Sequence, residues 1–106
     1  MTTTYFIATH VTPLPENPLN EKVVDAHVYF WVVDSSPDNA LERAKKHLSS
    51  YLWKLESIDT GPVETTAADF ADQEEGLKGF WQAKQKGFAA HFVATPKPGQ
   101  KEPEKS

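Results

Sequence analysis

The sequence predicts an α+β protein with a four-stranded, mostly antiparallel or mixed sheet in the chain order ββαβαβ. Two segments near the N-terminus are predicted to be strands because they are rich in β-branched and aromatic residues or alternate in polarity. Two later segments carry helix caps and apolar residues at helical spacing, and each is followed by another strand-like run. Strand–helix–strand crossovers are right-handed, so we expect both helices on one face, as in a ferredoxin-like two-layer sandwich.

Length and composition bound the domain organisation. The chain has 106 residues, of which 39% are hydrophobic and 25% charged, values typical of a globular protein with a single core. The last residues, ATPKPGQKEPEKS, are polar and rich in proline and lysine. We therefore expect one α+β domain over residues 1–95 and a disordered polar tail over 96–106.

Four segments are expected to form the sheet: Tyr5–Val11, Val23–Val33, Trp53–Ile58 and Phe88–Ala94. Gly61-Pro62 is expected to end the third strand. The second is long for a strand and is expected to pair on both sides. One of its faces is uniformly apolar and is predicted to be core, with the side chains of Val24, Ala26, Val28, Phe30 and Val32.

The first helix is predicted to begin after Ser36, a suitable N-cap, with Pro37 in the first turn, and to run to about Tyr51. Its apolar stripe is expected to contain Leu41, Ala44 and Leu48, followed by Tyr51 or Leu52. The basic cluster is expected to lie mainly toward water, with Arg43, Lys45 and Lys46.

The second helix is predicted to open at a capping box formed by Thr66 and Asp69 and to end at Gly87. Gly76 and Gly79 weaken its middle, since each glycine costs about 1 kcal/mol relative to alanine. A kink, or two shorter helices, is therefore compatible with this segment.

The second face of the central strand is the main functional candidate. It carries Asp25, His27, Tyr29 and Trp31, a group too aromatic for a surface that only meets water. Tyrosine and tryptophan are also favoured at binding surfaces. We expect a second subunit or another protein to cover this face; the alternatives are the chain's own proline-rich loop or tail, or a ligand.

Asp25 and His27 also suggest chemistry, because two positions apart on a strand places both side chains on one face. His91, and His10 from the first strand, join them if the strand registers align. A small-molecule-binding or metal-binding enzyme built around Asp25 and His27 is therefore the alternative function. The sequence contains no strong metal motif, identifies no catalytic residue, and leads us to expect no cofactor and no metal ion.

Charge and cysteine content restrict the partners. The formal net charge is −4, whereas proteins that bind nucleic acids rely on lysine and arginine, so we do not expect nucleic acid. The chain has no cysteine, which excludes disulfides and thiolate chemistry. No apolar run approaches the ~20 residues that span a bilayer, and the N-terminus has no basic, apolar leader, so we expect a cytoplasmic protein and no membrane partner.

These observations predict a non-enzymatic protein-interaction or regulatory module that forms a homodimer or binds a protein partner. The predicted interface or ligand residues are Asp25, His27, Tyr29, Trp31 and His91.

Overall fold

A computed structural model describes residues 2–98. The sheet has the strand order β3-β1-β2-β4 and every neighbouring pair is antiparallel. Along the chain the elements are β1 (Thr3–Pro13), β2 (Val23–Asp34), α1 (Pro37–Ser50), β3 (Trp53–Glu64), the short 3-10 helix η1 (Ala67–Phe70), α2 (Glu74–Lys86) and β4 (Phe88–Pro96). The predicted α+β class, with four strands and two helices, is confirmed. Neither a mixed sheet nor a ferredoxin-like arrangement is confirmed. Most of the predicted tail, residues 99–106, lies outside the described residues.

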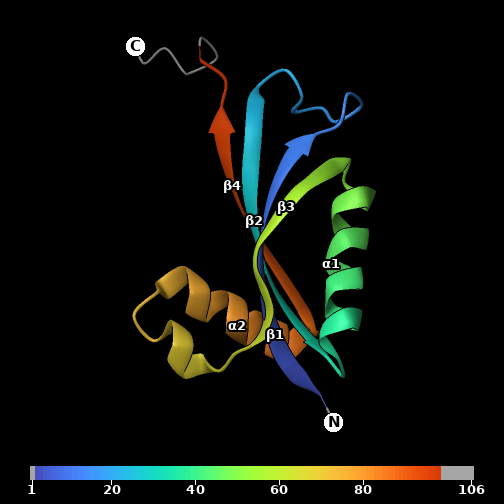
Figure 1. Ribbon diagram of the computed structural model, residues 1–106. Coiled ribbons are helices and arrows are strands. Elements are labelled where there is room, and N and C mark those ends of the chain that lie inside the picture. The colour runs from blue at the N-terminus through green and yellow to red at the C-terminus, as the bar shows by residue number, and fades with distance from the viewer. Residues whose placement is uncertain (1, 99–106) are drawn as a thin grey trace.

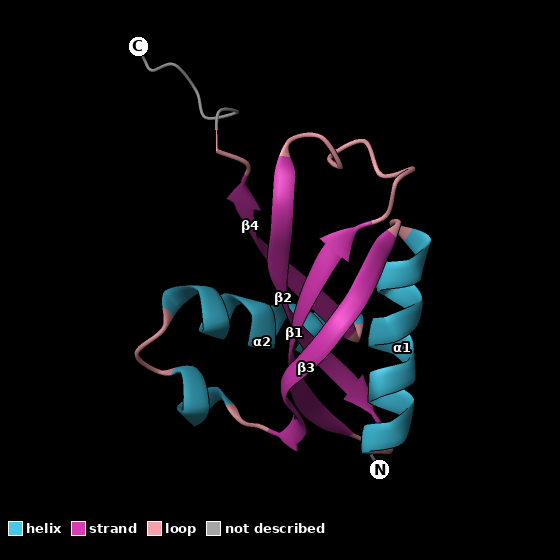
Figure 2. Ribbon diagram, turned by 45° about the horizontal axis from the view of Figure 1, so that its top comes forward, coloured by secondary structure: helices cyan, strands magenta, loops and turns pink. Residues whose placement is uncertain are grey.

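The two helices lie on opposite faces of the sheet, and the prediction that both cover one face is wrong (Figures 1 and 2). The helix α1 and the sheet form two layers, with Phe30 in the core between them. The helix α2 packs on the other face, against Trp31. The handedness rule applies to parallel strands, but β3 and β4 are antiparallel strands at opposite edges, so it does not fix the side of α2.

The strand β2 alternates as predicted over most of its length and anchors both cores. On the α1 side, Ala26, Val28, Phe30 and Val32 are fully buried. The predicted first member of that face is wrong, because Val24 is 45% exposed and Val23 is buried in its place. A register shift between Val23 and Asp25 in the pairing with β4 explains the exchange. One extra residue in β2 at this point moves the side chains before it to the opposite face of the sheet.

The helix α1 begins as predicted. The Asn39 N–H donates to Ser36 Oγ at 3.1 Å, and Pro37 occupies the first turn. The predicted Ala44 and Leu48 are buried, but Ala40 completes the stripe and Tyr51 is 62% exposed. One face of α1 therefore covers the sheet, and Tyr51, which directly follows the helix, leaves most of its side chain exposed.

The strand β3 continues through Gly61-Pro62, where the sequence predicted its end. The pairing with β1 shifts register between Phe6 and Ala8, opposite this dipeptide. Gly61 has φ +84, and a Cβ there would lie 2.1 Å from the Phe6 carbonyl oxygen. Glycine thus permits a bulge that carries the strand past the expected stop.

The predicted second helix forms two helices. The Thr66 N–H donates to Asp69 Oδ2 at 2.8 Å, as expected of a capping box, and this bond holds the pKa of Asp69 below its usual value. That cap opens only η1, and α2 begins at Glu74. The break lets Phe70 turn back onto the sheet beside Phe6, with ring centroids 5.4 Å apart.

Gly79 allows α2 to approach the sheet closely. A Cβ at this position would lie 2.5 Å from the Trp31 ring, which is fixed between Phe6 and Phe70. Helix propensity alone favours Gly79→Ala by about 1 kcal/mol. We nevertheless expect Gly79→Ala to lower the free energy of unfolding by about 1–2 kcal/mol, because overpacking outweighs propensity. Urea denaturation measures this, with the exposed Lys78→Ala as control; a more stable Gly79→Ala protein would show that α2 does not pack on Trp31.

Candidate interaction surface

The predicted interface residue Trp31 is a core residue in the structure. Its side chain is 3% exposed and lies in a cluster with Phe70, Phe80, Ala83 and Ala89. Within residues 2–98 its cover is η1 and α2 rather than the proline-rich loop, whereas the sequence predicted the second helix on the opposite face. Trp31 therefore holds α2 on the sheet.

Tyr29 and His91 lie beside the Trp31 cluster, at its border with solvent. Tyr29 stacks on Phe6, with ring centroids 6.2 Å apart and planes within 8°, and its ring centroid is 6.4 Å from that of His91. His91 Nδ1 lies 3.9 Å from Glu75 Oε1 of α2. These side chains help to line a small pocket of about 280 Å³. Part of the Tyr29 side chain therefore packs in the Trp31 cluster, and the rest faces solvent.

Asp25 and His27 occupy the open end of the same face. Asp25 Oδ2 lies 2.7 Å from His10 Nε2, and this hydrogen bond is the main reason that the pKa of Asp25 is held below its usual value. The His10 and His27 rings are 5.1 Å apart, and His27 Nδ1 lies 3.7 Å from Asp59 Oδ2. His10 therefore joins the predicted pair, whereas His91 pairs with Glu75 of α2.

The polar strip of His10, Asp25 and His27 is where the alternative function, a small-molecule-binding or metal-binding enzyme, would have its site. Among residues 2–98, no group of three or more histidine and carboxylate side chains is arranged to hold a metal ion. We therefore expect Zn²⁺ or Mn²⁺ to leave the Tm unchanged, since only a ligand that binds the folded state raises it. Thermal unfolding with each ion checks this. A rise in Tm that disappears in His27→Gln would establish a metal site and support the alternative.

The two edge strands of the sheet differ in charge and regularity. The edge strand β3 carries Lys54, Glu56, Asp59 and Glu64, contains Pro62, and shifts register against β1. These features prevent edge-to-edge pairing in natural sheets. The other edge, β4, has nine residues, FAAHFVATP, with no charged side chain and proline only at its end. Phe92 and Val93, on its two faces, are 38% and 47% exposed.

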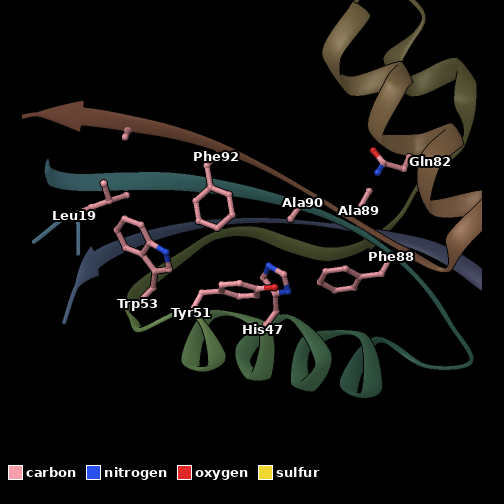
Figure 3. Close-up of a pocket in the computed structure, with 10 residues that line it drawn as sticks. Leu19, His47, Tyr51, Trp53, Gln82, Phe88, Ala89, Ala90 and Phe92 are labelled. Atoms are coloured by element: carbon pink, nitrogen blue, oxygen red, sulfur yellow. The ribbon is translucent and has the colours of Figure 1, made fainter. Parts of the chain in front are cut away.

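A groove of about 540 Å³ lies between α1 and β4 (Figure 3). It exists because α1 packs on β3, β2 and β1 and leaves the α1 side of β4 open. Figure 3 shows His47 and Tyr51 rising from α1 toward Phe92 on β4. The groove is lined mainly by apolar and aromatic side chains, including Leu19, His47, Tyr51, Trp53, Phe88 and Phe92.

His47 lies among the aromatic rings of this groove. Its ring centroid is 4.8 Å from that of Tyr51 and 5.0 Å from that of Phe88. Burial lowers the pKa of His47, because an apolar environment disfavours the charged imidazolium. The groove therefore presents a neutral ring at physiological pH.

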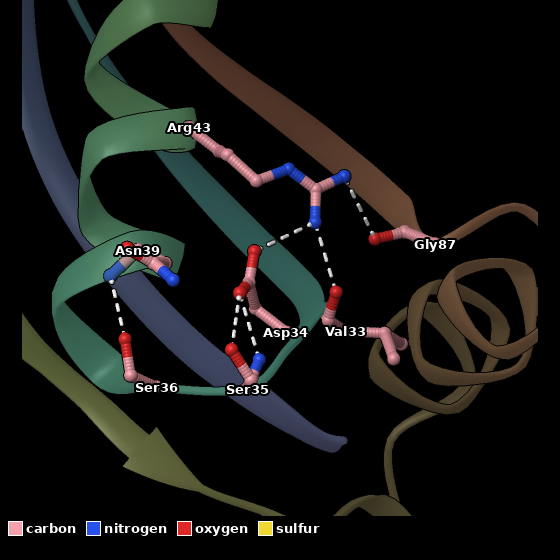
Figure 4. A network of polar contacts seen from close by, with 7 residues as sticks. All are labelled: Val33, Asp34, Ser35, Ser36, Asn39, Arg43 and Gly87. Carbon is pink, nitrogen blue, oxygen red and sulfur yellow. Dashed lines mark hydrogen bonds and ion pairs between the residues drawn. The ribbon is translucent and has the colours of Figure 1, made fainter. Parts of the chain in front are cut away.

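Arg43 fixes the start of β4 relative to α1 (Figure 4). Its Nη1 donates to the Val33 carbonyl at 2.8 Å and to Asp34 Oδ2 at 3.2 Å, and its Nη2 donates to the Gly87 carbonyl at 3.3 Å. The guanidinium also lies 5.5 Å from the centre of the Phe88 ring. The expectation that Arg43 lies mainly toward water is incomplete, because its charged head connects three elements.

The β4 edge and its groove were not predicted from the sequence. The residues missed are His47, Tyr51, Trp53, Phe88 and Phe92. One usable signal was present, since Phe88–Pro96 is an uncharged strand between polar segments. Its position at an edge depends on strand order, which the sequence did not specify.

In comparisons with protein-family models, curated proteins and solved structures, none matches this chain. No helix within residues 2–98 is long and apolar enough to cross a membrane.

The environment of His47 predicts a pH dependence of stability. Because the pKa of His47 is lowered in the folded protein, the unfolded chain takes up the proton first as the pH falls through about 6.5, the ordinary pKa of histidine. The free energy of unfolding should therefore decrease below that pH, and His47→Phe should remove this part of the decrease. Denaturant titrations from pH 7.5 to pH 5, with His91→Gln as control, measure it. An equal decrease in the wild type and His47→Phe would contradict the assignment.

Proposed function

We propose that the protein is a non-enzymatic protein-interaction or regulatory module whose contact surface is the β4 edge together with the adjoining groove. The observation that carries the proposal is the uncharged edge strand, which has exposed apolar side chains on both faces. Exposed uncharged edges readily pair with other chains, and contiguous apolar surface is typical of interfaces. The partner is a second copy or another protein, and we place the protein in the cytoplasm.

The proposal keeps the predicted function but moves its main surface. The sequence favoured Tyr29 and Trp31, whereas Trp31 supports α2 and Tyr29 is half-buried. The open groove on the opposite face offers a larger apolar surface, to which Tyr51 and Leu19 contribute exposed side chains. Asp25, His27 and His91 remain interface candidates on the α2 side, since each keeps part of its surface open.

A matched pair of variants tests the surface. Phe92 on β4 and Ile58 on the opposite edge strand are 38% and 37% exposed, so lysine at either position disturbs a similar amount of packing. In affinity capture from a native lysate, we expect the wild type and Ile58→Lys to retain the same partner, which is either another protein or a second copy of this chain. We expect Phe92→Lys to lose at least nine-tenths of the captured partner. Circular dichroism confirms that both variants are folded. Equal retention by all three proteins would contradict the proposed surface.

A further inference from the structure

The hydrogen-bonding direction of β4 follows from one bond at its start. The Val33 N–H donates to the Gly87 carbonyl at 3.0 Å, and the register continues this pair through Trp31 with Ala89 and Tyr29 with His91. In antiparallel strands, hydrogen-bonded pairs alternate with pairs whose backbone groups point away. The backbone groups that point to the free edge therefore belong to the other set: Phe88, Ala90, Phe92 and Ala94.

We infer that a second copy of this chain binds this edge, with the two β4 strands antiparallel about a two-fold axis at Phe92. The inference rests on the proposed function and specifies the partner. Phe92 exchanges backbone hydrogen bonds with Phe92 of the second copy, and Ala90 pairs with Ala94 of the second copy. The two sheets then form one continuous antiparallel sheet.

The β4 sequence is symmetric about this axis. Phe92 is the central residue of Phe88–Pro96, so this register overlaps the whole strand. Alanine lies on either side of Phe92 along the α1 face, which leaves room for two phenylalanine rings to meet across the axis. Pro96 lacks an N–H, but it lies at the end of the paired strands. The middle of the ladder therefore keeps all its hydrogen-bond donors.

Charge also favours a second copy. The whole chain has a net charge of −4, so two copies repel one another wherever acidic surfaces meet. The nine residues of β4 carry no charge, and its histidine, His91, lies opposite Val93 in the two-fold pairing. The edge β3, with its lysine and acidic side chains, would place charges directly against the second copy. Of the two edges, only β4 permits self-pairing without charge repulsion.

The contact area meets the lower requirement for a stable dimer. Nine residues at about 3.4 Å each make an edge ~30 Å long. With side chains on both faces the contact is roughly 20 Å wide, which buries about 600 Å² per copy, near the lower bound of ~1,200 Å² in total for specific interfaces. The side chains of Phe92 and Val93 supply the apolar centre.

Cysteine cross-linking tests the register, because the chain has no cysteine of its own. A hydrogen-bonded antiparallel pair places the two Cα atoms about 5.5 Å apart, within the range for a disulfide. We expect Phe92→Cys to form a covalent dimer under mild oxidation. Because Ala90 lies opposite Ala94 of the second copy, Ala90→Cys and Ala94→Cys should each form no covalent dimer alone and should cross-link when mixed, with Phe92 retained. Ile58→Cys is the control for random collision; cross-linking no faster than this control would overturn the inference.

Sedimentation equilibrium of the full chain tests the dimer itself. We expect a wild-type dimer at micromolar concentration, and a Kd raised roughly a hundredfold in Phe92→Lys, since two buried rings are lost and two like charges meet. Ala94→Pro should also weaken the dimer, because it removes an N–H that points to the free edge. Ile58→Lys should leave the Kd unchanged. A wild-type monomer at 100 µM, or a dimer unaffected by Phe92→Lys, would overturn the inference.

These results separate the inference from the proposed function. If the wild type is a monomer but Phe92→Lys still loses a different captured protein, the second copy is wrong and the surface is right. If the wild type dimerises regardless of Phe92→Lys and capture is also unaffected, both are wrong.

Discussion

The fold depends on the opposite orientation of two adjacent side chains in β2. Phe30 is fully buried on the α1 side of the sheet, and Trp31 is 3% exposed on the α2 side. Each anchors one helix, so a single strand contributes to both cores. Because side chains on a strand alternate, any register slip of β2 would exchange the two faces and disrupt both packing layers at once.

The two-sided burial of β2 also determines what stays open. The helix α1 covers β2, β1 and β3, whereas α2 and η1 cover only part of the other face, over β2, the first half of β4 and part of β1. In the part of the chain that the structure describes, no helix covers the α1 side of β4, and Arg43 holds the start of that strand against α1. The result is an ordered edge strand beside an aromatic groove, and this is the surface that we propose for a partner.

Sequence reasoning recovered the features that local physics determines. Alternation identified Phe30 and Val32 as core, and cap chemistry placed the start of α1 at Ser36. It failed where pairing between distant segments determines which face or edge a residue occupies. Val24 and Val23 exchange places at a register shift, and Trp31 appeared to be a surface residue because nothing in the local sequence assigns α2 to its face. The β4 site was missed for the same reason, since an edge is defined by strand order.

Amide hydrogen exchange along β4, measured residue by residue as protein concentration rises, tests the central claim most directly. Amides at Ala89 and His91 point to β2 and should be protected at every concentration. Amides at Ala90, Phe92 and Ala94 point to the free edge and should exchange rapidly when dilute and become protected at high concentration. Fast exchange at Phe92 at all concentrations would contradict the account, because the free edge of β4 would then pair with no strand of a second copy.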